Sequence, residues 1–241
     1  MTNPTAAMLV IGDEILSGRT REANAYHLAH RLVEVGIDLQ EIRVVPDDHE
    51  VIVEALRSLR DRVDHVFTSG GIGPTHDDIT ADAVAAAFEV GIGVREDARA
   101  LLEAAIGARR PVTDDDLRMA RIPEGATLIH NGISGVPGFS VGNVHVMAGV
   151  PSIFVVMLDA VLPTLASGAP VRSREVRFDV GEGRIATPLR ELAAVFPTLS
   201  IGSYPFAEPP VYGTNIVVRG TDAAALDEAV ARLEELRSTV A

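Results

Sequence analysis

The N-terminal part of the chain alternates short apolar runs with segments of helical periodicity, and this alternation restricts the possible fold more than any other feature. The apolar runs predict strands at residues 7–11, 37–45 and 63–68. Segments with apolar residues three and four positions apart predict helices at residues 24–35, 49–62 and 81–89. Strands that are joined through helices run parallel, with helices on both faces of the sheet. The sequence therefore predicts a three-layer α/β fold, whose ligands bind beyond the carboxyl ends of the strands.

The rest of the chain adds elements to this domain and then indicates a second, smaller one. Helices are expected at residues 96–107, 114–121 and 151–166, a strand at 126–131, and a hairpin at 138–147. The Ser-Gly-Ala-Pro segment at residues 167–170 is the best linker candidate. The pattern beyond it is β-α-β-β-α, with strands at 174–180, 199–204 and 215–219 and helices at 185–196 and 223–239. We therefore expect a domain at 1–168 with a mostly parallel sheet and a small α+β domain at 172–241.

The composition excludes several classes of function. A net charge of −13 repels nucleic acid and anionic membranes, so neither is expected as a partner. The absence of cysteine excludes iron–sulfur clusters, Cys-ligated zinc and thiolate nucleophiles. All 21 basic residues are arginine, which excludes a Walker-type lysine but leaves bidentate binding of phosphate. Residues 1–8 do not resemble a signal peptide, and the apolar stretch 144–165 is interrupted by polar residues and prolines, so a cytoplasmic protein is expected.

A glycine-rich block follows the third predicted strand and is the main candidate for a binding site. It reads Thr-Ser-Gly-Gly-Ile-Gly-Pro-Thr-His-Asp-Asp-Ile-Thr over residues 68–80. Its glycines are Gly70, Gly71 and Gly73. Glycine lets backbone N–H groups approach a phosphate, and the N-terminus of the following helix adds positive potential. Because Asp77 and Asp78 would repel that phosphate, the block predicts a divalent cation with oxygen ligands beside it.

A purely structural role is the alternative interpretation of the same block. Aspartate is favoured at helix N-termini, and Thr75 with Asp78 has the spacing of a capping box. The glycines would then form only a tight turn. His76 could contact phosphate or act as an acid, or it could have no role beyond the turn. Thr80 could contribute a hydroxyl group to the phosphate.

Polar residues also follow the first two predicted strands. Gly12, Asp13 and Glu14 follow the first strand, and Asp47 follows the second. These residues are expected near the glycine block, because the carboxyl ends of parallel strands meet at one edge of the sheet. Asp13 or Asp47 could orient a water molecule or bind a second cation, and Glu14 could be a further carboxylate of the site or a capping residue.

Five blocks, in order along the chain, resemble one known family. They are residues 11–18 with Asn24, 45–48, 69–80, 138–139 with 143–151, and 201–205 with 215–222. The chain resembles the MoaB/Mog family of molybdopterin-binding domains, in the branch found in competence/damage-inducible protein A and at the front of eukaryotic FAD synthases. The resemblance covers nearly the whole chain. It implies a MoaB/Mog-like fold and, because domains of this family usually self-associate, a homo-oligomer.

The resemblance also implies a function and adds to the set of site residues. Relatives in this branch cleave ADP-ribose or FAD-type diphosphates, which implies a metal-dependent nucleotide pyrophosphatase. The expected catalytic residues are Asp78, Asp77 and Asp13. The expected ligands of a divalent cation, with Mg²⁺ as the first choice, are Asp78, Asp77 and Asp47. The residues expected to bind a nucleotide or molybdopterin are Gly12, Glu14, Asn24, Gly70, Gly71, Gly73, Thr75, His76, Thr80, Gly138, Gly149 and Pro151.

The chain departs from the family pattern in two places, which keeps other functions open. Molybdopterin adenylyltransferases of the family usually have threonine at the position of Ile72. They also have a Pro-Gly-Ser/Val-Pro turn where this chain has Ala-Gly-Val-Pro at residues 148–151. The alternatives are a non-catalytic module that binds a pterin or nucleotide, and adenylyl transfer to molybdopterin in the biosynthesis of the molybdenum cofactor.

Overall fold

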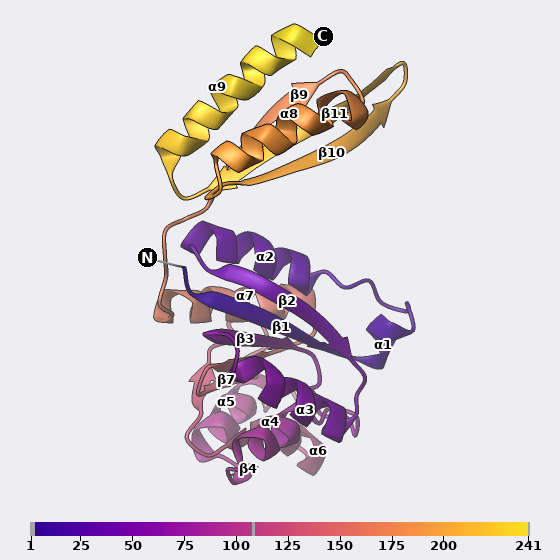
Figure 1. Cartoon of the computed structure of the whole chain (residues 1–241). Helices are drawn as coiled ribbons and strands as arrows, with labels where there is room; N and C mark the ends of the chain where they lie inside the picture. Colours follow the sequence, from indigo (N-terminus) through magenta and orange to yellow (C-terminus); the bar gives the residue numbers. More distant parts are fainter. Residues whose placement is uncertain (1–2, 108, 241) are drawn as a thin grey trace. The chain divides into compact units, whose positions relative to one another are not determined.

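The computed structural model describes residues 3–107 and 109–240. Contacts within the chain divide it into two compact units, with the boundary between Gly168 and Ala169. Figure 1 labels most of the helices and strands of both units. Within the described residues, no helix combines the length and hydropathy needed to cross a bilayer.

A six-stranded sheet forms the centre of the N-terminal unit, in the order β2-β1-β3-β8-β7-β6. The strands are β1 (Thr5–Ile11), β2 (Asp38–Val45), β3 (His65–Ser69), β6 (Thr127–Ile129), β7 (Gly138–Val141) and β8 (Val144–Met147). The first four in spatial order run parallel, whereas β7 is antiparallel to both of its neighbours. Gly142 adopts a positive φ in the turn between β7 and β8, as a tight hairpin requires. The mostly parallel sheet predicted from the sequence is confirmed.

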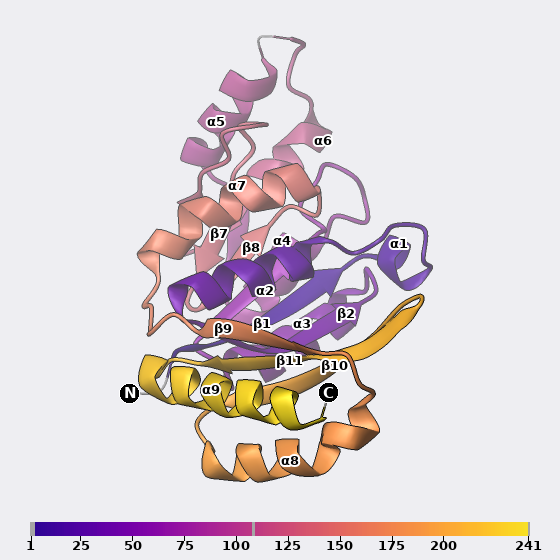
Figure 2. The ribbon, with the colours of Figure 1, turned by 90° about the horizontal axis from the view of Figure 1, so that it is seen from above.

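Helices cover both faces of this sheet because alternate residues of its strands are apolar on both sides. Ala7, Leu9 and Ile11 of β1 face a cluster that includes α3 (His49–Arg60), α4 (Thr80–Phe88) and α5 (Glu96–Ile106). Ala6, Met8 and Val10 face the opposite cluster, which includes α2 (Asn24–Val35) and α7 (Pro151–Val161). Figure 2 shows α2 and α7 side by side on this face. A short 3-10 turn, η2 (Leu162–Thr164), follows α7.

Three short elements, which are α1, β4 and β5, had no counterpart among the predicted ones. The predicted helix at 114–121 ends early as α6 (Asp114–Leu117) and continues as the 3-10 turn η1 (Arg118–Ala120). The chain then forms β5 (Arg121–Pro123), which pairs with β4 (Ile92–Val94). A further helix, α1 (Asp13–Leu16), follows β1. Elements of three or four residues are too short to show a period in the sequence.

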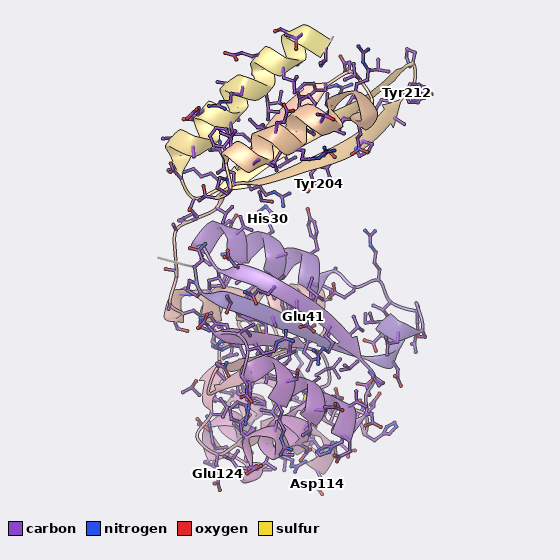
Figure 3. All side chains as sticks on the ribbon, viewed as in Figure 1. His30, Glu41, Asp114, Glu124, Tyr204 and Tyr212 are labelled. Carbon is purple, nitrogen blue, oxygen red and sulfur yellow. The ribbon has the colours of Figure 1, made fainter. Side chains whose placement is uncertain are left out.

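The C-terminal unit is a three-stranded antiparallel sheet with two helices. Its elements are β9 (Arg172–Phe178), α8 (Glu182–Val195), β10 (Ser200–Glu208), β11 (Val211–Gly220) and α9 (Ala223–Val240). The strand order is β10-β11-β9, and the helices pack on a cluster that includes Phe178, Ile216 and Leu233. The β10–β11 hairpin is longer than predicted, because Pro205 lies in an edge strand, where proline is tolerated. Tyr204 and Tyr212 lie on the surface of this hairpin (Figure 3).

A buried histidine lies in the middle of the N-terminal sheet. His145 of β8 is 5% exposed, and its Nδ1 lies 2.9 Å from Oγ of Ser140. Its Nε2 lies 3.5 Å from Nδ1 of His65, and its ring packs on Phe67 with 5.2 Å between the ring centres. Burial, together with the charge of the neighbouring His65, lowers the pKa of His145 from 6.5 to about 4. The folded protein therefore keeps this side chain neutral at pH values where the unfolded chain protonates it.

The buried His145 predicts a pH dependence of stability. Between the two pKa values the unfolded state binds the proton and the folded state does not, so the free energy of unfolding falls as the pH falls. This residue alone should lower that free energy by about 2 kcal/mol between about pH 7 and about pH 5. His145→Gln should remove this part of the slope, as measured by urea unfolding at a series of pH values. His30→Gln on the exposed face of α2 is the control (Figure 3); parallel curves for the wild type and His145→Gln would contradict the prediction.

Candidate functional site

A cleft of about 570 Å³ lies at the carboxyl edge of the N-terminal sheet. The loop after β3 and the turn between β8 and α7 contribute to its wall. Apolar side chains line much of it, namely those of Ile72, Met119, Val136, Val150, Ile153 and Met157. The polar groups come from the two turns and from Glu14, Thr20, Asp78, Asn131 and Ser134. A concave, largely apolar cleft of this volume with a few polar groups has the character of a small-molecule site.

The loop after β3 needs glycine at two consecutive positions. Gly70 and Gly71 have φ values of +106° and +67°, which disfavour other residues. A Cβ atom on Gly70 would lie 2.2 Å from the carbonyl oxygen of Ile11, and one on Gly71 would lie 2.2 Å from Oγ1 of Thr80. The buried Thr80 donates from Oγ1 to the carbonyl of Gly70 at 2.9 Å, and from its N–H to the carbonyl of Gly71 at 3.0 Å. These two hydrogen bonds from the buried Thr80 therefore stabilise the conformation of the loop.

Three consecutive backbone donors of this loop are unpaired. Among the described residues, the N–H groups of Gly71, Ile72 and Gly73 have no hydrogen-bond acceptor, although all three residues line the cleft. The flanking N–H of Gly70 is paired with the carbonyl of Met147 at 3.2 Å. Consecutive free N–H groups in a glycine loop form a concave site for an anion. The backbone of the loop therefore offers three donors that a phosphate could use.

The second wall of the cleft is fixed by a buried asparagine. Asn24, at the start of α2, donates from Nδ2 to Oγ of Ser69 at 2.7 Å and to the carbonyl of Gly149 at 2.8 Å. A Cβ on Gly149 would lie 3.3 Å from Cα of Gly70, so the two turns almost touch. Pro151 lines the cleft as the first residue of α7. Asn24 thus joins the turn after β3 to the turn after β8, and its amide is used within the protein.

Asp78 lines the cleft beside the unpaired N–H groups. Its Oδ2 accepts hydrogen bonds from the N–H of Thr75 at 2.8 Å and from Oγ1 of Thr75 at 2.5 Å. The carboxylate packs over Gly73, where a Cβ would lie 2.6 Å from Oδ2. Neither this residue nor Asp77 caps a helix, because Ile79 is the N-cap residue of α4 and the cap has no side-chain hydrogen bond. The carboxylate closes the loop through one oxygen, while Oδ1 has no hydrogen-bond partner within the described part of the chain.

Glu14 is the other carboxylate that lines the cleft. It lies in the short helix α1, and its side chain folds back over the end of β1. A Cβ on Gly12 would lie 2.5 Å from Oε2 of Glu14, so glycine at position 12 makes room for this carboxylate. The N–H of Gly12 also pairs with the carbonyl of Val45 at 3.1 Å, which fixes the end of β1 against the end of β2.

The remaining predicted acidic residues lie in a separate hollow beside the cleft. Asp13, Asp47, Asp77 and the exposed His76 line this hollow together with Glu14. Oδ2 of Asp47 accepts the N–H of Asp13 at 2.9 Å. Burial raises the pKa of Asp47, and the nearby charges of Asp13, Glu14 and Asp77 act in the same direction.

The structure therefore separates the neighbouring Asp77 and Asp78. The first lines the acidic hollow, the second lines the cleft, and Glu14 lines both. Within residues 3–107 and 109–240, no three Asp, Glu or His side chains are grouped closely enough to hold a metal ion by themselves.

Gly138 does not line the cleft or the hollow. It is buried in β7, where a Cβ would lie 2.3 Å from the carbonyl oxygen of Val146, so its small size serves packing between the strands.

Sequence reasoning missed part of the cleft wall. Met119 comes from η1, and Asn131, Ser134 and Val136 come from the loop between β6 and β7. Asn131 orders that loop, because Nδ2 donates to the carbonyl of Val136 at 2.9 Å and Oδ1 accepts the N–H of Ile133 at 3.0 Å. The Asn-Gly pair at residues 131–132, which is typical of a turn, was the one indication of this loop in the sequence.

The fold and cleft define an α/β domain with a glycine loop at the carboxyl edge of its mostly parallel sheet. A family model described as "Probable molybdopterin binding domain" matches residues 7–167, and one described as "FAD synthase, middle domain" matches residues 170–239. The chain belongs to this molybdopterin-binding domain family, of the MoaB/Mog type, and the resemblance inferred from the sequence is confirmed.

Individual relatives support the same assignment. A protein of Archaeoglobus fulgidus is 30% identical, over 95% of this chain and 96% of its own length. A CinA-like protein of Gemmatimonas aurantiaca is 35% identical, over 77% of this chain and 47% of its own length. A probable FAD synthase of Caenorhabditis elegans is 29% identical, over 96% of this chain and 50% of its own length. The chain thus spans about half the length of these last two relatives.

A solved structure is also similar to the N-terminal unit. The crystal structure of CinA from Thermoplasma acidophilum is 33% identical, with a TM-score of 0.63. The match covers 67% of this chain and 97% of that one.

The crowded backbone at position 71 gives a test of the loop. Gly71→Ala should destabilise the protein by at least about 1–2 kcal/mol, because the left-handed conformation disfavours alanine and the new methyl group displaces Thr80. Denaturant unfolding measures the loss. Gly93→Ala is the matched control, since a Cβ there would meet no described atom within 4 Å beyond its chain neighbours, and its φ is not positive. Equal stability of the two variants would show that the loop does not need glycine at this position.

Proposed function

We propose that the chain is a metal-dependent hydrolase of nucleotide diphosphates of the ADP-ribose or FAD type. The observation that carries this proposal is the row of three unpaired N–H groups on residues 71–73 beside the carboxylate of Asp78. The N–H row suits one phosphate of a diphosphate, and the apolar wall of the cleft suits a flat ring system. The similarity to CinA-like proteins and FAD synthases supports a ligand of the nucleotide class.

The residues of the cleft fit a divalent cation that is shared with the substrate. Mg²⁺ is commonly held by one or two carboxylates together with substrate phosphates, so a cage made only of protein atoms is unnecessary. Asp78 and Glu14 both line the cleft, and Oδ1 of Asp78 is free to act as a ligand. When bound, such an ion would neutralise the diphosphate and make a coordinated water a better nucleophile.

The chain's own groups then have separate roles in hydrolysis. The N–H groups of Gly71, Ile72 and Gly73 hold the oxygens of one phosphate and stabilise the negative charge that develops there. Water attacks phosphorus, the bridging P–O bond breaks, and the two products are phosphate monoesters. Asp47 could take up the proton that this water releases, because it lies in the adjacent hollow that Glu14 also lines, and burial raises the pKa of its carboxyl group. Asp13 keeps Asp47 in place through its N–H group.

A second candidate is a binding module for a pterin, without turnover. The description of the matching family as a molybdopterin-binding domain favours it. The same N–H row would bind the pterin's phosphate, with Asp78 serving only to close the loop through Thr75. Ile72 offers no hydroxyl group to the cleft, so adenylyl transfer to molybdopterin has less support.

The two candidates differ in turnover and in dependence on a cation. The hydrolase should convert ADP-ribose to AMP and ribose 5-phosphate with Mg²⁺ or Mn²⁺ and should stop when a chelator is added. Asp78→Asn and Glu14→Gln should each lower kcat/KM by at least about 10- to 100-fold, a range known for the loss of even an indirect metal partner. Quantifying AMP by chromatography measures this loss.

Glu54→Gln is the matched control, because Glu54 is an exposed carboxylate of α3 that lines none of these cavities. Its activity should equal that of the wild type. Tight binding of a pterin by a wild-type protein that hydrolyses neither ADP-ribose nor FAD would favour the second candidate.

A further inference from the structure

One arginine beside the glycine loop is left almost without partners. Arg118 lies next to a small cavity that Gly71, Gly73 and Asp78 also line. Its only hydrogen bond within the described residues runs from Nη2 to the carbonyl of Asp78, at 3.4 Å. Its Nε is buried and has no acceptor. A buried donor without a partner is costly, so such a group calls for an explanation.

Neighbouring arginines show that this lack of partners is specific. Arg121 lines the same cavity but forms a bidentate pair with Asp82, at 2.6 and 2.8 Å. Arg110 forms a bidentate pair with Asp116, at 2.5 and 2.7 Å. Among the residues that the structure describes, no carboxylate lies within ion-pair distance of Arg118. In a chain with 34 acidic and 21 basic residues, a partly buried arginine without a carboxylate is unusual.

The backbone, rather than the guanidinium group's own contacts, fixes the position of Arg118. The preceding helix α6 is closed by a capping box between Thr113 and Asp116. Directly after the turn, the carbonyl of the buried Ala120 accepts the N–H of Arg95 at 3.0 Å. Both ends of η1 are therefore anchored. Of the carboxylates that line this cavity, Asp82 is paired with Arg121, and Asp78 accepts two bonds from Thr75 through Oδ2.

We infer that Arg118 is the cationic residue that binds the phosphate of the ligand held on the N–H groups of Gly71–Gly73. The small cavity, of about 20 Å³, has room for roughly one water, so the phosphate would lie in the larger cleft. The guanidinium group would contact it beside the glycine loop residues that line both spaces. The two terminal nitrogens of arginine form a fork that matches two phosphate oxygens, and they do not share the burial of Nε. This inference rests on the proposed function for the class of ligand, but it concerns binding and not turnover.

The inference also accounts for how an acidic protein retains an anion. The cleft contains the carboxylates of Asp78 and Glu14, and neither can contact a phosphate without a cation between them. Arg118 supplies a permanent positive charge beside the glycine loop residues that both cavities share. It would hold phosphate even before a metal ion arrives.

Calorimetric titration of ADP-ribose, inorganic pyrophosphate and adenosine, with chelator present, tests this role. Arg118→Gln should weaken binding of ADP-ribose and pyrophosphate by about 10- to 100-fold, the usual contribution of charge-assisted hydrogen bonds. It should leave the affinity for adenosine unchanged and reduce the salt dependence of ADP-ribose binding. Arg118→Lys should retain part of the affinity, because it keeps the charge but loses the fork. Arg99→Gln, on the exposed side of α5, is the matched control.

The outcomes separate this inference from the proposed function. Wild-type protein that binds ADP-ribose without hydrolysing it would refute the hydrolase, while a selective loss in Arg118→Gln would still support the inference. Unchanged binding of ADP-ribose and pyrophosphate in that variant would overturn it. An equal loss for adenosine, with unfolding curves as in the wild type, would overturn it in favour of a role in positioning Asp78. Failure of the wild type to bind either phosphate ligand would also overturn it.

Discussion

The close approach of two backbone turns sets the shape of the cleft in the N-terminal unit. Gly70 follows β3 and Gly149 follows β8, and a Cβ atom on Gly149 would lie only 3.3 Å from Cα of Gly70. The amide of Asn24 joins the two turns through Ser69 and the carbonyl of Gly149. With the turns fixed in this way, the N–H groups of the glycine loop remain unpaired without the loop collapsing. Neighbouring groups, and not a ligand, therefore hold the backbone of this loop open.

Glycine also positions the two carboxylates of the cleft. Asp78 packs over Gly73, and Glu14 packs over Gly12. In both cases a Cβ atom would lie within 2.6 Å of a carboxylate oxygen. Glycines around this cleft thus have two roles. Some leave backbone N–H groups available to a ligand, and others allow an acidic side chain to lie close to the backbone. The carboxylates would repel a phosphate bound to the nearby N–H groups. A cation and Arg118 would offset this repulsion.

Periodicity and glycine spacing were enough to predict the central fold and the loop. Strands such as β1 are long and apolar on both faces, which leaves a clear pattern in the sequence. The short strands β4 and β5 carry no such pattern, although they help to place Arg118 beside Asp78, a residue 40 positions away in the chain. The sequence also could not separate Asp77 from Asp78, because the path of the backbone decides which hollow each adjacent side chain faces.

The hydrogen bonds of Asn24 determine when the pocket can form during synthesis of the chain. The residues that it joins are 24, 69 and 149, so the pocket draws on most of the length of the N-terminal unit. A nascent chain that has emerged only as far as α5 already contains the whole glycine loop, yet it lacks the turn against which that loop rests. The glycine loop can therefore reach its folded setting only after β8 has left the ribosome and inserted beside β3.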